Sequence, residues 1–132
     1  MAIILVIAGI IWCPRRLKNQ LPKEKIISIT VEYEKYTIDG VEKATAEIAQ
    51  DKIPEFEEKL NSFWYINYID FCKCYISSPE IYTITYENYT VVLGEYRLSV
   101  YNHQTKESIG PGNIYQIYPM SVYSELKGLF LI

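Results

Sequence analysis

The side chains that could carry catalysis are few in this sequence, and they are widely separated. Its one histidine, His103, lies in a polar stretch between Asn102 and Gln104. Catalysis by this imidazole would require a carboxylate or a thiol within hydrogen-bond reach in a pocket, whereas a histidine in a polar loop is more often simply solvated. The stretch Gly110-Pro111-Gly112 does not predict a phosphate-binding loop, because no Lys-Ser or Lys-Thr pair follows it.

The three cysteines, Cys13, Cys72 and Cys74, cannot all pair within the chain. Cys72 and Cys74 are two positions apart, so on a strand they point the same way with Cα atoms near the upper limit for a disulfide. As zinc ligands they would be two of the four that a structural site needs, and Cys13 and His103 are the only further soft donors. We therefore expect buried free thiols, no metal and no cofactor.

Neighbouring carboxylates occur as Glu57-Glu58 and, in the hairpin predicted below, as Glu32 opposite Glu47. Carboxylates on a charged helix or sheet face are usually solvated, and nothing in the sequence predicts a cleft that would make either a glycosidase pair. We expect no catalytic residues and a function other than catalysis. An enzyme stays open only if His103 meets the condition above.

The length, charge and tyrosine content limit the classes of protein to which this chain can belong. The chain has 132 residues, which is the length of about one domain. It contains 13 Lys and Arg residues and 16 Asp and Glu residues. The net charge of -3 and the pI near 5.2 argue against nucleic acid as a partner. The thirteen tyrosines fall mostly at predicted strand positions. There a ring can pack against the protein while its hydroxyl stays in contact with water, so we interpret the tyrosines as structural.

The secondary structure that must position these residues is clearest in the stretch 81–101, whose pattern predicts three antiparallel strands. Two-residue turns at Glu87-Asn88 and Gly94-Glu95 would place Ile84 opposite Val91 and Leu93 opposite Tyr96. Side chains alternate across a strand, so one face is apolar. That face collects Tyr82, Ile84, Tyr86, Tyr89, Val91, Leu93, Tyr96, Leu98 and Val100. The other collects Thr83, Thr85, Thr90, Val92, Arg97, Ser99 and Tyr101.

An earlier hairpin is predicted around Asp39-Gly40, the strongest turn dipeptide in the chain. Residues 26–38 alternate, and counting outward from this turn places Ile38 opposite Val41. The apolar face of the first strand then holds Ile27, Ile29, Val31 and Tyr33. A helix capped by Asp51 follows, with a buried stripe of Ile53, Phe56, Leu60 and either Phe63 or Trp64.

The remaining segments complete an α+β fold. Residues 65–76 read as a central strand, 102–112 as a loop and 114–118 as a short edge strand, and a last helix begins at Pro119 and ends near Gly128. We predict one antiparallel sheet of about five to six strands, built from two hairpin or meander units. One main helix and a short C-terminal helix lie on one of its faces. Residues 26–132 form this single domain, and residues 14–25 a polar linker.

The N-terminal segment, residues 1–13, contains the uncharged run Ala2 to Trp12, which is too short to cross a membrane as a helix. Two interpretations stay open: part of a membrane anchor, or an element of the folded core. If Met1 is an internal methionine of a longer membrane helix, the domain lies outside the cytoplasm. If Met1 is the true start and the segment inserts, Arg15, Arg16 and Lys18 would hold the domain in the cytoplasm.

The run ITYENYTVVLG, followed by a closing YSELKGLF behind an apolar N-terminus, resembles small membrane-anchored α+β proteins of Gram-positive bacteria. The resemblance covers Glu80 to Phe130, and Tyr89 stands where the pattern has its hairpin glycine or that glycine's neighbour. It implies an anchored extracytoplasmic domain. It implies no activity and supplies no site residues.

What remains as a candidate site is the weakly polar sheet face. No predicted helix needs to cover it, so it could bind a protein, a glycan or a second copy of the chain, or it could simply face water. We predict a membrane-associated binding domain that uses Thr83, Thr85, Thr90, Arg97, Ser99 and Tyr101. The alternative is a soluble acidic inhibitor or immunity-type protein that blocks another macromolecule.

Overall fold

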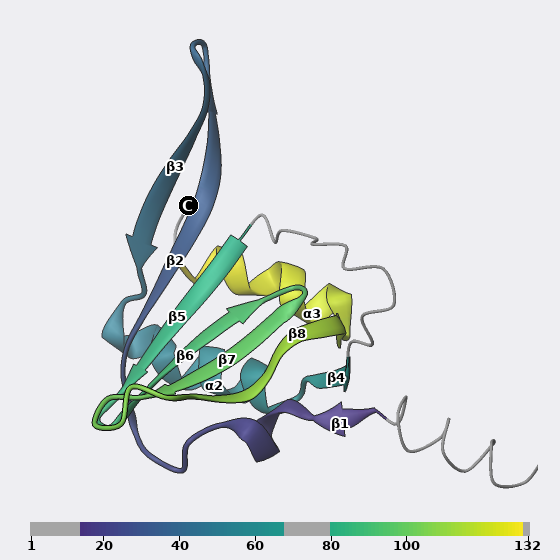
Figure 1. The fold of residues 1–132 in the computed structure, drawn as a ribbon. Helices are drawn as coiled ribbons and strands as arrows, with labels where there is room; N and C mark the ends of the chain where they lie inside the picture. The colour runs from purple at the N-terminus through teal and green to yellow at the C-terminus, as the bar shows by residue number, and fades with distance from the viewer. Residues whose placement is uncertain (1–13, 68–79, 131–132) are drawn as a thin grey trace, which may run out of the picture.

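The computed structural model describes residues 14–67 and 80–130, and these form the α+β fold shown in Figure 1. The strands are β1 (Arg15–Arg16), β2 (Ile26–Thr37), β3 (Gly40–Glu47), β4 (Trp64–Asn67), β5 (Glu80–Tyr86), β6 (Tyr89–Gly94), β7 (Arg97–Asn102) and β8 (Ser108–Tyr118). The α-helices are α2 (Ile53–Asn61) and α3 (Met120–Glu125). The described residues also contain three 3-10 helices: η1 (Leu17–Gln20), η2 (Gln50–Lys52) and η3 (Leu126–Phe130).

All strand pairs between described residues are antiparallel, in the order β1-β4-β8-β7-β6-β5-β2-β3. The predicted α+β class and antiparallel sheet are confirmed. The sheet has eight strands rather than five to six, and β8 lies inside it rather than at an edge. Residues 108–112, predicted as a loop, belong to β8, which pairs with β7 through its first half and with β4 through its second.

The helices pack on one face of this sheet and enclose the core. Tyr82 of β5 lies at its centre, with ring centroids 5.7 Å from Phe56 of α2, 5.9 Å from Tyr123 of α3 and 5.7 Å from Phe130 of η3. Burial raises the pKa of the Tyr82, Tyr86 and Tyr123 hydroxyls far above the usual value, because ionisation there would place a charge in apolar surroundings. The predicted helical stripe is confirmed, with Phe63 buried next to it, while Trp64 is exposed.

The first turn of the meander has the predicted register, with Ile84 opposite Val91. The second does not: Leu93 faces Leu98 instead of Tyr96, and the loop residues are Glu95 and Tyr96. In this register the carbonyls of Glu95 and Tyr96 accept hydrogen bonds from the backbone N–H groups of β8 at 3.3 and 2.9 Å. A shift of two residues preserves the alternation, so the strand side chains keep their predicted faces.

The hairpin of β2 and β3 shows the same kind of shift. Its loop is Ile38-Asp39, and Tyr36 rather than Ile38 lies opposite Val41. Gly40 has φ +128°, a conformation that side chains rarely adopt, which fixes glycine as the first residue after the loop. Glu32 lies opposite Thr45 instead of Glu47, and it forms a 3.3 Å ion pair with Lys43.

A β-bulge near the start of β2 changes which side chains face the core there. Ile26 pairs with Tyr86 and Ser28 with Thr85, so Ile27 is an extra residue in its strand. Ile27 therefore turns outward and is exposed, and Ile26 takes its place in the core. Beyond the bulge, Ile29 and Val31 lie on the predicted apolar face and are fully buried.

The outer part of this hairpin, residues 34–43, projects beyond the body of the protein as an arm (Figure 1). Only the section of β2 from Ile26 to Tyr33 pairs with β5, so the strands of the arm pair only with each other. Three apolar side chains of the arm are consequently open to solvent: Tyr36 is 80% exposed, Val41 55% and Ile38 105%.

Residues 14–25, predicted as a linker, are docked on the domain. Leu17 is fully buried, and its N–H donates a 3.1 Å hydrogen bond to the carbonyl of Phe63. Glu24 accepts hydrogen bonds from the backbone N–H of Asn88 at 3.1 Å and from its side chain at 2.6 Å. The apolar run Ala2 to Trp12 and the three cysteines lie outside the described residues. Among the residues that are described, no helix is both long and apolar enough to cross a membrane.

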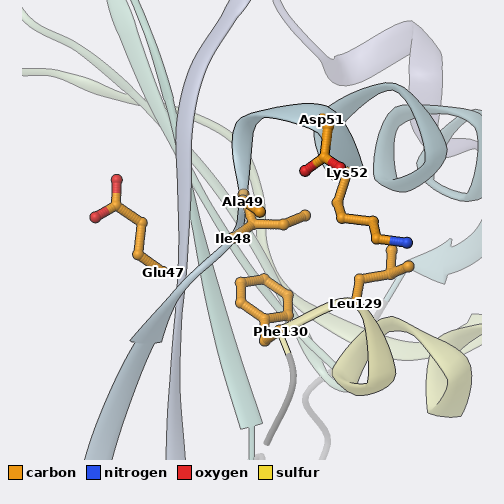
Figure 2. A pocket seen from close by; sticks show the side chains of 7 residues that line it. All are labelled: Glu47, Ile48, Ala49, Asp51, Lys52, Leu129 and Phe130. Atoms are coloured by element: carbon orange, nitrogen blue, oxygen red, sulfur yellow. The ribbon is translucent and has the colours of Figure 1, made fainter.

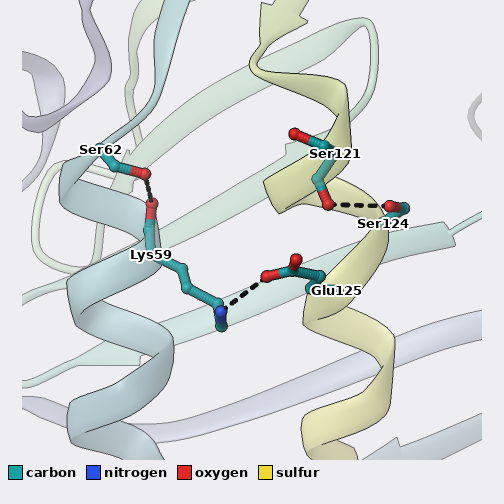
Figure 3. Close-up of polar contacts among 5 residues, drawn as sticks. All are labelled: Lys59, Ser62, Ser121, Ser124 and Glu125. Atoms are coloured by element: carbon teal, nitrogen blue, oxygen red, sulfur yellow. Dashed lines mark hydrogen bonds and ion pairs between the residues drawn. The ribbon is translucent and has the colours of Figure 1, made fainter.

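The helix ends differ from the predictions in two places. Asp51 lies in η2 and does not cap α2, whose first turn instead contains Pro54. Gly128 lies inside η3, because the chain tightens into a 3-10 turn from Leu126. Lys59 of α2 donates a 2.9 Å hydrogen bond to Glu125, which ties the two helices together (Figure 3). Of the predicted central strand 65–76, the part up to Asn67 belongs to β4, next to the edge strand β1, and the rest lies outside the described residues.

Candidate binding surface

The sheet face opposite the helices, here called the open face, carries all six predicted site residues. The register forms two rows across β5, β6 and β7. The first row is Thr85, Thr90 and Tyr101, and the second is Thr83, Val92 and Ser99. In the parts of the chain that the structure describes, the helices gather on the opposite face, so no helix covers these rows. Arg97 stands on the same face, opposite Gly94.

The open face continues onto β2, which the sequence analysis did not connect to it. Ser28 lies opposite Thr85, and Thr30 lies opposite Thr83. Both belong to the polar side of the predicted alternation in residues 26–38. That alternation was the available signal, but no local pattern shows that β2 pairs with β5. The result is a surface on which hydroxyl side chains recur across four neighbouring strands.

Arg97 is fixed along β7 by two neutral partners. Its Nε donates a 3.3 Å hydrogen bond to the Ser99 hydroxyl, and its Nη2 donates one of 2.8 Å to the Tyr101 hydroxyl. The arginine side chain therefore lies over Ser99, which is only 4% exposed although it stands on the open face. Among the described residues no carboxylate pairs with Arg97. A guanidinium has five N–H donors, so this one keeps donors and a positive charge for an external group.

His103 forms a second polar arrangement at the end of β7. Its Nε2 lies 2.7 Å from the Thr90 hydroxyl, and its Nδ1 lies 3.1 Å from the carbonyl of Glu87. A carbonyl can only accept, so Nδ1 carries a proton, and in the neutral imidazole Nε2 accepts from the Thr90 hydroxyl. The backbone N–H of His103 also donates a 2.9 Å bond to the carbonyl of Asn88. These contacts fasten the turn after β7 to the turn between β5 and β6.

The order of Thr90, His103 and Glu87 resembles an activated hydroxyl, in which a histidine accepts from a nucleophile. Its surroundings differ from those of a reaction centre. Neither ring partner of His103 is a carboxylate or a thiol, and His103 is an exposed side chain. The arrangement is well suited to holding two turns in register.

Two clefts flank the first turn of α2, away from the predicted site. The larger, of about 500 Å³, lies between the end of β3 and η3. Figure 2 shows Ile48 and Phe130 on one side of it and Lys52 and Leu129 on the other, while Glu47 points away. The smaller, of about 270 Å³, is lined by Lys25, Ile26, Gln50, Ile53, Pro54 and Glu57. Sequence reasoning missed both, because each is built from segments far apart in the chain.

Metal ligands do not gather in the described residues, where no group of three or more His, Cys, Asp or Glu side chains is placed to hold an ion. Comparisons of the chain with protein-family models, with curated proteins and with solved structures found no match.

Proposed function

We propose that this chain is a non-enzymatic binding domain whose open face receives a protein partner. The observation that carries the proposal is Arg97, which is held flat against the sheet by Ser99 and Tyr101 and has no carboxylate partner among the described residues. An arginine fixed in this way is preorganised, so little side-chain entropy is lost when a carboxylate binds it. The surrounding threonine hydroxyls can donate to or accept from polar groups of the same partner.

The partner that this surface fits is a protein presenting Asp or Glu side chains among polar groups. Short hydroxyl side chains make up much of this face, and Gly94 opposite Arg97 has no side chain. Such a polar surface suits a protein surface better than a small molecule, which usually binds in an apolar pocket. Membrane association through Ala2 to Trp12 would place the face next to partners at a membrane.

Site-specific photo-crosslinking in cells tests the proposal. A crosslinker at Thr85 on the open face should capture a defined protein, and the yield should fall at least tenfold in an Arg97→Gln background, as expected for a hydrogen bond to a charged group of about 1.5–3 kcal/mol. The control places the same crosslinker at Glu58, on the exposed side of α2. Equal capture from both positions, or capture that Arg97→Gln leaves unchanged, would rule out the open face as the contact.

Membrane association has its own test. We expect the full-length chain to sediment with membranes and to need detergent for release. Recovery of the full-length protein in the soluble fraction without detergent would count against an anchor. That outcome would favour the soluble inhibitor instead, without changing the residues assigned to the binding face.

A further inference from the structure

β3 is the last strand at one end of the sheet, and its outer side has no partner strand among the described residues. The N–H of Ile48 donates a 2.9 Å bond to the carbonyl of Ile29, which fixes which residues face β2. The backbone N–H and C=O groups of successive residues alternate in direction along an antiparallel strand. Those that point away from β2 belong to Val41, Lys43, Thr45 and Glu47. Such a row of backbone groups is a template for another strand.

The sequence of β3 matches a second copy of itself in one register. In a two-fold symmetric antiparallel pair, residues facing one another point to the same side of the sheet. When Thr45 faces Thr45 of the second copy, Lys43 faces Glu47 of that copy, and symmetry makes this pair twice. Ala44 then faces Ala46, so small side chains meet on the other side. Moving one step either way places Thr45 opposite Lys43 or Glu47, and both charge pairs are lost.

The same register brings each arm to the large cleft of the other copy. Beyond the pair of Lys43 with Glu47, each arm continues past the end of β3 of the other copy, toward Ala49 and η2. The cleft of about 500 Å³ opens there, with Ile48, Leu129 and Phe130 in its lining (Figure 2). The tip of the arm carries Ile38, which is 105% exposed in the single chain, whereas Val41 lies on the same side of the sheet as Glu47, away from the cleft. The exposed tip and the largely apolar cleft are thus separated by the length of β3, and an antiparallel pair of arms brings them together twice.

We propose that two copies of this chain pair edge to edge through β3, with Thr45 on the two-fold axis and the tip of each arm beside the cleft of the other copy. Charged residues on an edge strand usually oppose pairing between copies. In β3 the charged side chains repel one another or stay unpaired in other registers. In the register with Thr45 opposite Thr45, each Lys43 attracts Glu47 of the other copy. The pairing uses the edge of the sheet and leaves the open face around Arg97 available.

Proline at position 45 provides the first test. The N–H of Thr45 faces away from β2, so Thr45→Pro removes no hydrogen bond within the hairpin, and proline is tolerated on an edge strand. The same N–H would bond the second copy. The full-length chain, kept in detergent, should sediment with a concentration-dependent protein mass that approaches two chains. Under the same conditions Thr45→Pro should sediment as one chain with an unchanged circular dichroism spectrum. A wild-type chain that stays monomeric at its highest soluble concentration, or a Thr45→Pro variant that still forms a dimer, would overturn the proposal.

A charge exchange tests the register without relying on the proline variant. Lys43→Glu and Glu47→Lys each replace two opposite-charge pairs with two like-charge pairs, so each should raise the dimer Kd about tenfold. The double variant should return it to near the wild-type value. Lys43 also pairs with Glu32 in its own chain, so the thermal midpoint is measured alongside. A double variant no tighter than the single ones would reject this pairing. Arg97→Gln should leave the Kd unchanged, which separates this interface from the proposed function.

Discussion

Nη2 of Arg97 donates a 2.8 Å hydrogen bond to the hydroxyl of Tyr101, four residues further along the same strand. Side chains four positions apart stand on one face of a strand about 13 Å from each other, so the arginine must lie extended along β7 to make this bond. Its path covers Ser99. The Tyr101 hydroxyl therefore determines where the positive charge of the open face is located.

Removing that hydroxyl should release the arginine. We expect Tyr101→Phe to lower the free energy of unfolding by about 0.5–1.5 kcal/mol, the usual net contribution of one hydrogen bond. The Nε–H signal of Arg97 in NMR spectra should also exchange faster with solvent. Chemical denaturation and hydrogen exchange measure the two effects. Tyr89→Phe is the control, because Tyr89 is a half-buried residue whose hydroxyl has no hydrogen bond among the described residues. Equal effects of the two variants would contradict the assignment.

Adjacent valines on β6 test the two faces of the sheet. Val91 is fully buried among core residues, whereas Val92 stands half-buried on the open face. Val91→Asp should unfold the protein, because the cost of burying an unpaired carboxylate is comparable to the whole stability of a domain. Val92→Asp should retain a cooperative transition with a modestly lower midpoint. Thermal unfolding followed by circular dichroism distinguishes them, and a Val91→Asp variant that kept the wild-type midpoint would show that the faces are reversed.

The buried tyrosines predict a loss of stability in alkali. Below about pH 10, Tyr82, Tyr86 and Tyr123 are protonated in both folded and unfolded chains, so their raised pKa values have no effect on stability there. Above that pH the unfolded chain loses these protons while the folded chain keeps them. The free energy of unfolding should then fall by up to about 1.4 kcal/mol per pH unit for each tyrosine.

Ultraviolet absorbance of phenolate during an alkaline titration, compared with circular dichroism, measures this linkage. We expect Tyr82, Tyr86 and Tyr123 to ionise together with unfolding. Tyr123→Phe should make the decline in stability shallower. Ionisation of all the tyrosines near pH 10 while the circular dichroism spectrum is still folded would contradict their burial.

The contacts of His103 predict a local effect. His103→Ala removes the ring that bridges the Thr90 hydroxyl and the Glu87 carbonyl, so the turn after β7 should exchange its amide hydrogens faster. The loss in global stability should stay near about 1 kcal/mol, because the broken hydrogen bonds are exposed. Gln104→Ala, in the same turn, is the matched control for the exchange rates. Unchanged exchange in His103→Ala would show that the ring does not hold the turn.

Side-chain alternation predicted more of this fold than turn chemistry did. Val91 and Thr90 were assigned to their correct faces even though the second turn of the meander was misplaced, because the error was two residues and the alternation repeats every two. The error itself came from reading Gly94 as a turn residue. The observed turn accepts hydrogen bonds from β8, a strand that no pattern near Gly94 predicts.

The bulge and the candidate site show where sequence reasoning ends. Ile27 has the same local signature as Ile29, and only the pairing of β2 with β5 makes it the extra residue. The six residues of the open face were identified from alternation alone. The path of Arg97 to Tyr101, and the cleft between Ile48 and Phe130, depend on contacts that a linear pattern does not encode.

Because β8 pairs with β7 through its first half and with β4 through its second, the last segment of the chain supplies both an interior strand and the closing helices. The turn that leads into it, with exposed Gln104 and Thr105, is a natural point for proteolytic cleavage. A single cut there would yield two fragments that share one core and stay joined without a covalent link. Neither fragment alone would contain a complete sheet, so the cut chain should behave as a complementing pair in which each piece folds only on the other.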